Sequence, residues 1–166
     1  GFGLETARYF LEQGWKVIAT MRAPQEGVLP ASDRLRLVRL DVTSAQSIAE
    51  AIAEVGEIDV LVNNAGVGML NALEGAPREA IANLFATNTL GTIAMTQAVI
   101  PRFRARRSGT IVNITSAVTL QPMPLLAVYT ASKAAVNAFT ESLALELLAF
   151  NIRVGLRSEE RRVGKE

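Results

Sequence analysis

Short apolar runs alternate along the chain with longer segments of helical periodicity. The short runs, which have the composition of β-strands, lie at residues 15–21, 35–41, 58–62, 110–114 and 151–154. Helical periodicity covers residues 4–13, 43 or 44 to about 55, 77–106 with a break expected near 88, and 129–149. Strands that alternate with helices in this way predict an α/β fold, in which a doubly wound parallel sheet lies between two helical layers.

Composition narrows the chemistry that such a fold could carry. A chain of 166 residues is long enough for one globular domain with its own core. It contains neither cysteine nor histidine, which excludes disulfides, a Cys/His metal site, a thiol nucleophile and a Ser-His-Asp triad. Acid–base chemistry therefore falls to carboxylates, lysine or tyrosine, and no metal site is predicted.

Charge and hydropathy set the expected surroundings of the protein. The net charge of +1 gives no electrostatic reason to expect a nucleic acid as partner. No apolar run is long enough to cross a membrane, and no signal peptide opens the chain. A soluble cytoplasmic protein without a membrane partner is the resulting expectation.

Both ends of the chain are unusual. The sequence begins at Gly1 within the opening of a helix, so we expect a preceding strand of the parent protein to be missing. The last residues, 157–166 (RSEERRVGKE), are highly charged and resemble a translated sequencing adapter. We therefore predict a partial domain over residues 1–156 and a non-native tail over 157–166, with a native solvated tail as the alternative.

The segment Gly1-Phe2-Gly3 directly precedes the first helix. Glycines at this place let backbone N–H groups approach a phosphate at the positive end of the helix. Taken alone, these three residues favour the simpler interpretation of a tight turn.

Tyr129 and Lys133 open the longest predicted helix and are the strongest candidates for chemistry. Their i, i+4 spacing places both side chains on one face of that helix. A phenol is a poor acid–base group near neutral pH, but a neighbouring ammonium favours its ionised form. Ser116, in the loop after the strand at 110–114, offers a hydroxyl for a carbonyl oxygen. A buried tyrosine beside a surface lysine, and a turn-forming serine, are the alternatives.

Four sequence features occur together and in chain order. They are NNAG at Asn63–Gly66, NTLG at Asn88–Gly91, Ser116, and YTASK at Tyr129–Lys133. With them the chain, from Gly1 to about Leu156, resembles the classical short-chain dehydrogenases/reductases. The resemblance implies an NAD(P)-binding domain of Rossmann type, three-layered and truncated here, and an oxidoreductase activity.

The resemblance implies a role for each catalytic candidate. Tyr129 is the implied general acid–base group, and Lys133 is implied to bind the nicotinamide ribose and to favour the phenolate. Ser116 is implied to hydrogen-bond the substrate oxygen, and Asn88 to kink its helix and hold a water of the proton relay. Asp59 is expected to have a structural role.

The resemblance also implies cofactor contacts. Gly1 and Gly3 match glycines of the family's phosphate-binding turn, and Asp41 matches the aspartate that contacts the adenine. The full set of expected cofactor-binding residues is Gly1, Phe2, Gly3, Arg22, Asp41, Asn63, Ala65, Gly66, Tyr129 and Lys133.

The residues after the strand at 15–21 indicate which cofactor is used. NAD enzymes of this type place an acidic residue there, on the ribose 2′-hydroxyl. This chain has Met21 followed by Arg22, and a guanidinium suits a 2′-phosphate. NADP(H) is therefore favoured over NAD(H), with a merely solvated Arg22 as the alternative.

The expected reaction of the parent protein is reversible reduction of a carbonyl by NADPH, while the fragment itself is expected to be inactive. A catalytically silent NADP(H)-binding regulator of the same fold is the main alternative. An epimerase or dehydratase of the extended group is disfavoured by the NNAG turn. Apolar residues near the expected crevice indicate a small-molecule substrate with an apolar body: Met69, Leu70, Val118, Leu120, Met123, Leu125 and Leu126. Small residues on the Tyr129 helix suit pairing into a homodimer or homotetramer, or packing within the chain: Ala134, Ala135, Ala138 and Ser142.

Overall fold

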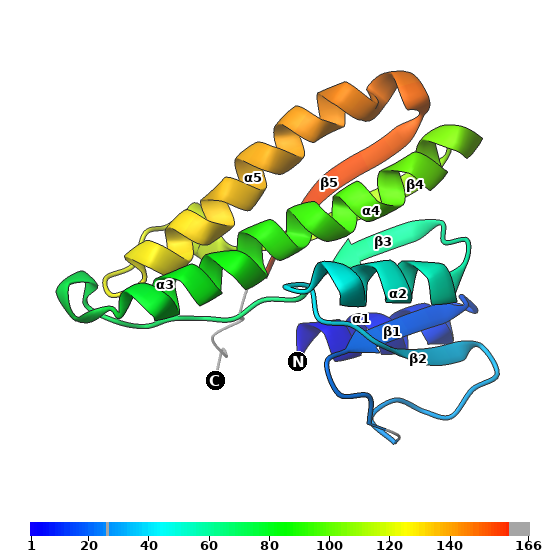
Figure 1. Ribbon diagram of the computed structural model, residues 1–166, viewed down its shortest axis with the longest axis horizontal. Helices are drawn as coiled ribbons and strands as arrows, with labels where there is room; N and C mark the ends of the chain where they lie inside the picture. Colours follow the sequence, from blue (N-terminus) through cyan, green and yellow to red (C-terminus); the bar gives the residue numbers. More distant parts are fainter. Residues whose placement is uncertain (26, 160–166) are drawn as a thin grey trace, which may run out of the picture. The chain divides into compact units, whose positions relative to one another are not determined.

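The computed structural model describes residues 1–25 and 27–159 of the chain. The chain divides into two compact units, Gly1–Glu57 and Ile58–Glu166. Each unit contains a parallel sheet with flanking helices, as expected for a Rossmann-type α/β fold (Figure 1). Where the sequence predicted one sheet, the described residues form two, of two and three strands.

The first unit is built from two helices and two strands. Its elements are α1 (Phe2–Glu12), β1 (Val17–Met21), β2 (Leu35–Arg39) and α2 (Ala45–Val55). The strands pair in parallel from Val17↔Leu35 to Met21↔Arg39. Ser44 caps α2 because its hydroxyl accepts a hydrogen bond from the backbone N–H of Ser47, which agrees with the helix start predicted at 43 or 44.

The second unit carries the longer helices. Its strands are β3 (Val60–Asn63), β4 (Gly109–Ser116) and β5 (Ile152–Glu159), in the order β3-β4-β5 and all parallel. Its helices are α3 (Arg78–Phe85), the π-helical turn η2 (Ala86–Leu90), α4 (Gly91–Arg106) and α5 (Ala127–Leu147). Short 3₁₀ turns are η1 (Leu73–Gly75), η3 (Ala117–Thr119) and η4 (Leu148–Phe150).

A buried polar network places α4 and α5 on one face of this sheet. Asn63 on β3 and Asn113 on β4 are register partners, and Asn63 Nδ2 donates to Asn113 Oδ1 at 2.8 Å. Asn63 Nδ2 also donates to Thr96 Oγ1 of α4, while Asn113 Nδ2 donates to Thr140 Oγ1 of α5. Neighbouring side chains in register lie on the same face of a sheet, so both helices cover the face that carries these asparagines.

A corner at the start of β4 and β5 joins the ends of two helices. Arg107 after α4 and Asn151 after η4 both adopt left-handed backbone conformations, with φ of 51° and 57°. Asn151 Nδ2 donates to the Arg107 carbonyl at 3.2 Å. Gly109 begins β4 against the buried Phe103, whose ring lies 2.3 Å from the position of any added Cβ. The strands pair from Gly109↔Ile152 onwards, directly after this corner.

Several element boundaries differ from the sequence prediction by about two residues, and three differences bear on the candidate site or the chain end. Ser116 was predicted to lie in the loop after the strand, but β4 continues to Ser116, so this residue ends the strand. Pairing with β5 extends β4 this far. The break expected near Asn88 is a π-helical turn inside an otherwise continuous helix. β5 reaches Glu159, so it includes the first residues of the predicted tail, whereas residues 160–166 lie outside the described part.

The length and hydropathy of the described helices bear on whether any of them could span a membrane. None of them, in residues 1–25 and 27–159, is long and apolar enough to cross a bilayer.

Candidate active site

Lys133 is a buried ammonium on the first half of α5. The residue is 5% exposed, and its Nζ donates to the Ile114 carbonyl on β4 at 3.1 Å. A Cβ added to Gly66, which follows β3 in the NNAG turn, would lie 3.2 Å from this Nζ. Glycine at this position therefore lets the turn approach the lysine closely.

Asn88 ties the same turn to the helices. It lies in the π-helical turn, is 1% exposed, and its side-chain amide pairs with both backbone groups of Val67: Oδ1 accepts from the N–H at 2.8 Å, and Nδ2 donates to the C=O at 2.9 Å. Nδ2 also donates to Ser132 Oγ on α5 at 3.1 Å. The Asn88 carbonyl accepts a hydrogen bond from Thr92 Oγ1 at 2.9 Å.

Tyr129 and Lys133 both lie on α5, so the predicted i, i+4 placement on one helical face is confirmed. Tyr129 is partly buried. Its backbone carbonyl accepts a hydrogen bond from Ser132 Oγ at 2.7 Å. The expected acid–base residue is thus in a helix turn that is itself bonded to the Asn88 turn.

Ser116 is buried at the carboxyl end of β4. Its Oγ accepts a long hydrogen bond from the Val118 N–H at 3.4 Å, and its carbonyl accepts from Thr119 Oγ1 at 2.8 Å. Asn137 Nδ2 of α5 donates to Thr119 Oγ1 at 3.1 Å. These bonds connect the segment that follows Ser116 to the helix that carries Tyr129 and Lys133.

Asn63, Ala65 and Gly66 differ in their surroundings. The Asn63 side chain is buried in the polar network of the core, where it bonds to Thr96 and Asn113. Ala65 and Gly66 are exposed. Asp59 forms an ion pair with Arg106 at 3.4 Å, and its carbonyl accepts from the Thr110 N–H, as suits a structural residue.

The glycine segment of the first unit opens α1. Gly1 is the N-cap, and its carbonyl accepts from the N–H groups of Leu4 and Glu5 at 3.0 and 3.3 Å. No side chain caps this helix. The backbone N–H groups of the first turn, at Phe2 and Gly3, thus lie at the positive end of a helix without a side-chain acceptor.

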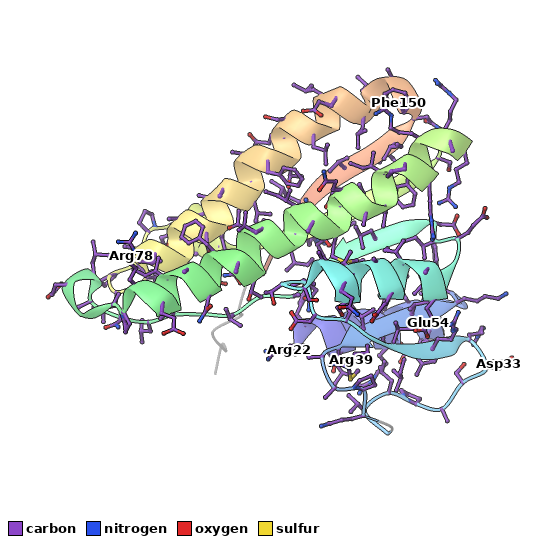
Figure 2. All side chains as sticks on the ribbon, in the orientation of Figure 1. Arg22, Asp33, Arg39, Glu54, Arg78 and Phe150 are labelled. Atoms are coloured by element: carbon purple, nitrogen blue, oxygen red, sulfur yellow. The ribbon has the colours of Figure 1, made fainter. Side chains whose placement is uncertain are left out.

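Arg22 and Asp41 follow β1 and β2 in the same unit. Arg22 is exposed (Figure 2). Asp41 Oδ1 accepts from Thr43 Oγ1 at 2.7 Å and from the Thr43 N–H at 2.9 Å. These two hydrogen bonds, with smaller contributions from the charges of Arg22 and Arg39, lower the pKa of Asp41 below its usual value.

The structure thus brings Gly66, Asn88 and Lys133 together in the second unit, and it links the segment after Ser116 to α5 through Thr119 and Asn137. Other predicted contacts, Gly1, Phe2, Gly3, Arg22 and Asp41, lie in the first unit. The sequence did not predict the buried hydroxyls of Thr89 and Ser132; burial and hydrogen bonds mark them in the structure, and small polar residues of a helix give no such signal in sequence. Residues 1–25 and 27–159 contain no group of three or more acidic side chains placed to hold a metal ion.

A family model described as short chain dehydrogenase matches residues 1–156. The chain belongs to the short-chain dehydrogenase family. Among curated relatives, retinol dehydrogenase 8 of Bos taurus is 41% identical over 168 residues, covering 94% of this chain and 54% of the relative. A 3-ketodihydrosphingosine reductase of Bacteroides thetaiotaomicron is also 41% identical, over 94% of this chain and 58% of the relative. The chain therefore spans a little over half the length of these relatives.

Solved short-chain dehydrogenases have the same fold. A serine dehydrogenase complexed with NADP⁺ superposes with a TM-score of 0.87 at 34% identity, over 94% of this chain and 66% of that chain. Other similar structures contain NADPH or, in a reductase from Brucella melitensis, NADH. Nicotinamide cofactors are thus common to the family, with both NADP and NAD forms among its similar structures.

Proposed function

We propose that the protein carrying this chain is an NADP(H)-dependent oxidoreductase that interconverts a carbonyl and a secondary alcohol. Tyr129, Lys133, Ser116 and Asn88 are its proposed catalytic residues. The observation that carries the proposal is the buried Lys133 ammonium, which lies beside Gly66 and one helical turn after Tyr129. A buried charge is unfavourable unless the fold or the function uses it.

Each side chain has a distinct task in this proposal. The Tyr129 hydroxyl donates a proton to the carbonyl oxygen during reduction and accepts it back during oxidation. The Lys133 ammonium stabilises the phenolate that remains after this transfer. Ser116 Oγ, at the end of β4, donates a hydrogen bond to the same substrate oxygen. When bound, the nicotinamide supplies or accepts the hydride.

The residues present fit such a cofactor. Gly66 leaves open the space beside Lys133 Nζ and Asn88 Oδ1 that a Cβ would occupy, at 3.2 and 3.4 Å from these atoms. Lys133 and Tyr129 would hold the nicotinamide ribose. The uncapped first turn of α1, at Phe2 and Gly3, suits the pyrophosphate because its N–H groups lie at the positive helix end.

The preference for NADP(H) rests on Arg22. It follows the carboxyl end of β1 and is exposed, so its guanidinium can pair with a 2′-phosphate. Asp41 is the proposed contact of the adenine, with Thr43 fixing its carboxylate.

The substrate is proposed to have an apolar body. The loop after β3 and the loop after β4 are joined by a backbone hydrogen bond from the Asn71 N–H to the Leu125 carbonyl at 2.9 Å. Leu70, Leu120 and Met123 in these loops are strongly exposed, Leu120 to 76%. Exposed apolar side chains grouped in this way are typical of a binding surface. Two relatives are named for retinol and 3-ketodihydrosphingosine.

The same protein is proposed to form a homodimer or homotetramer through α5. Ala134 and Ala138 are exposed on this helix, and Leu145 is exposed further along it. Small residues permit close approach of a second helix, and an exposed leucine on the same helix favours burial by a partner.

Replacing Tyr129 by phenylalanine tests the activity directly. In the complete protein, Tyr129→Phe is expected to lower the turnover of NADPH with a panel of ketones and aldehydes by about 10²–10⁴-fold, because the proton donor is lost. NADPH binding, measured by fluorescence titration, is expected to persist.

The matched control is Tyr9→Phe, which changes the other tyrosine of the chain, 61% exposed on α1. It is expected to leave turnover unchanged. Near-normal turnover by Tyr129→Phe would refute the assignment of the acid–base group. A wild-type protein that binds NADPH but reduces none of the carbonyls would instead support a silent regulator.

A further inference from the structure

Two consecutive side chains of the π-helical turn form hydrogen bonds to the helix turn between Tyr129 and Lys133. Asn88 Nδ2 donates to Ser132 Oγ at 3.1 Å, and Thr89 Oγ1 donates to the Ser132 carbonyl at 3.0 Å. Ser132 is fully buried, and Thr89 is buried as well. One residue of α5 therefore receives hydrogen bonds on both its side chain and its backbone from the same turn.

Ser132 also bonds to the expected acid–base residue, Tyr129. Its Oγ accepts from Asn88 and donates to the Tyr129 carbonyl at 2.7 Å. The next residue along the helix is Lys133, whose Nζ is held by Ile114. Any movement of Ser132 along or about the helix axis would move Tyr129 and Lys133 with it, because helix backbone is stiff over one turn.

The wide π-helical turn makes this double contact possible. A π-helical turn contains more residues than an α-helical turn, and such turns occur mostly as single interruptions at functional sites. Here it directs Asn88 and Thr89, neighbours in sequence, to the same residue of α5. Asn88 simultaneously pairs with both backbone groups of Val67, next to Gly66.

We infer that Thr89 and Ser132 are positioning residues of this enzyme. They set the depth at which α5 lies against the Gly66–Val67 turn, and thereby the place of Tyr129 and Lys133. This inference rests on the proposed oxidoreductase function. A displacement of about 1 Å at reacting groups can lower a rate about 10²-fold, so the contacts of Thr89 and Ser132 are expected to affect turnover more strongly than cofactor affinity.

Thr89→Val tests these contacts with little change in shape, because valine replaces the hydroxyl with a methyl group. In the complete protein, kcat per folded molecule is expected to fall about tenfold, with a smaller change in KM for NADPH. The pH at which kcat/KM for alcohol oxidation is half-maximal is expected to move, because Tyr129 and Lys133 shift together relative to β4, where the Ile114 carbonyl holds Lys133 Nζ. Thr89→Ser, which restores the hydroxyl, is expected to restore both.

Thr140→Val is the matched control. Thr140 is also a buried threonine, on α5 itself, and its Oγ1 donates to the Val136 carbonyl at 2.6 Å. Its hydrogen-bond partners in the described part of the chain are Val136 and Asn113, and neither belongs to the Asn88 turn. This variant is expected to lower the melting temperature while keeping the wild-type pH profile.

Ser132→Ala is an independent test of the inference. It removes the hydroxyl that bonds to both Asn88 and Tyr129, and it leaves the hydrogen bond from Thr89 to the Ser132 backbone carbonyl. It is expected to lower kcat and to shift the same pH profile. Wild-type kcat per folded molecule and an unshifted pH profile in Thr89→Val or Ser132→Ala overturn the inference, even where melting temperatures fall. An active Tyr129→Phe in the same series would refute the proposed function instead, so the two failures are distinguishable.

Discussion

In the first unit, Asp41 is held by Thr43, two positions further along the chain, whereas in the second unit Asn88 is held by Val67 and Ser132, 21 and 44 positions away. Arg22, another proposed binding residue of the first unit, is exposed. The proposed binding residues of the first unit thus depend on local turns, while the proposed catalytic residues of the second depend on contacts between distant elements.

This difference predicts how each unit tolerates substitution. Changes at exposed residues usually alter stability by no more than about 0.5 kcal/mol. Removing one partner of a buried hydrogen bond costs about 1–3 kcal/mol, because the remaining group is left unsatisfied. Cofactor preference should therefore be alterable without loss of stability, whereas changes around the catalytic residues should alter activity and stability together.

The largest stability effect is expected for Asn113→Ala in the second unit. Asn113 is fully buried and bonded to Asn63 and Thr140, so the substitution removes two hydrogen bonds and leaves a cavity. The free energy of unfolding is expected to fall by about 2–4 kcal/mol. Urea denaturation of the complete protein measures it, and Asn83→Ala, at an exposed asparagine of α3, is the control. If Asn113→Ala lowered the free energy of unfolding no more than Asn83→Ala does, the proposed difference in tolerance between the two units would be wrong.

A smaller effect, on cofactor choice alone, is expected for Arg22→Asp. A carboxylate repels the 2′-phosphate and can accept a hydrogen bond from the 2′-hydroxyl. The ratio of kcat/KM for NADPH to that for NADH is expected to fall about 10–100-fold, equivalent to about 1.4–2.8 kcal/mol. Steady-state kinetics with both cofactors checks this, alongside Arg34→Asp, an exposed arginine of the same unit. An unchanged ratio would show that Arg22 is merely solvated.

The smallest effect is expected for Thr43→Val. It removes the main cause of the lowered pKa of Asp41, so this pKa is expected to rise towards its usual value of 3.8, which an NMR titration of the carboxyl group can follow. A lowered pKa in the folded state stabilises the protein above the unfolded pKa, and this stabilisation is lost as the pH falls through the folded pKa. The variant is therefore expected to lose less stability than the wild type on acidification. Thr43→Ser, which keeps the hydroxyl, is expected to titrate like the wild type.

Much of the fold follows from local signals in the sequence. The cap at Ser44 and the glycine after α1 mark helix ends through hydrogen bonds to nearby residues. The strand after Glu57 and the helix of Tyr129 follow from apolar runs and helical periodicity. These features depend on residues close together in the chain, which is why a single sequence is sufficient to predict them.

What escaped prediction depends on tertiary contacts. Ser116 belongs to β4 because Glu159 of β5 pairs with it, and nothing local to Ser116 indicates a strand. Asn113 and Thr140 form a polar layer in the core, where an apolar interior is the usual expectation. A break near Asn88 was predicted, but its form as a π-helical turn was not, and Asn88 there bonds to partners in other elements, at Val67 and Ser132.

The corner formed by Arg107 and Asn151 has a consequence for how the protein reaches its native state. Parallel pairing of segments far apart in the chain is slow to nucleate, because a long loop must close before any contact compensates. The hydrogen bond between Asn151 and Arg107 brings Gly109 and Ile152 close together, and these two residues form the first pair between β4 and β5. A slip of β4 by one residue would turn each of its side chains, Asn113 and Ser116 included, to the other face of the sheet. The contact between two left-handed residues thus defines the alignment on which the proposed chemistry at the far end of the ladder depends.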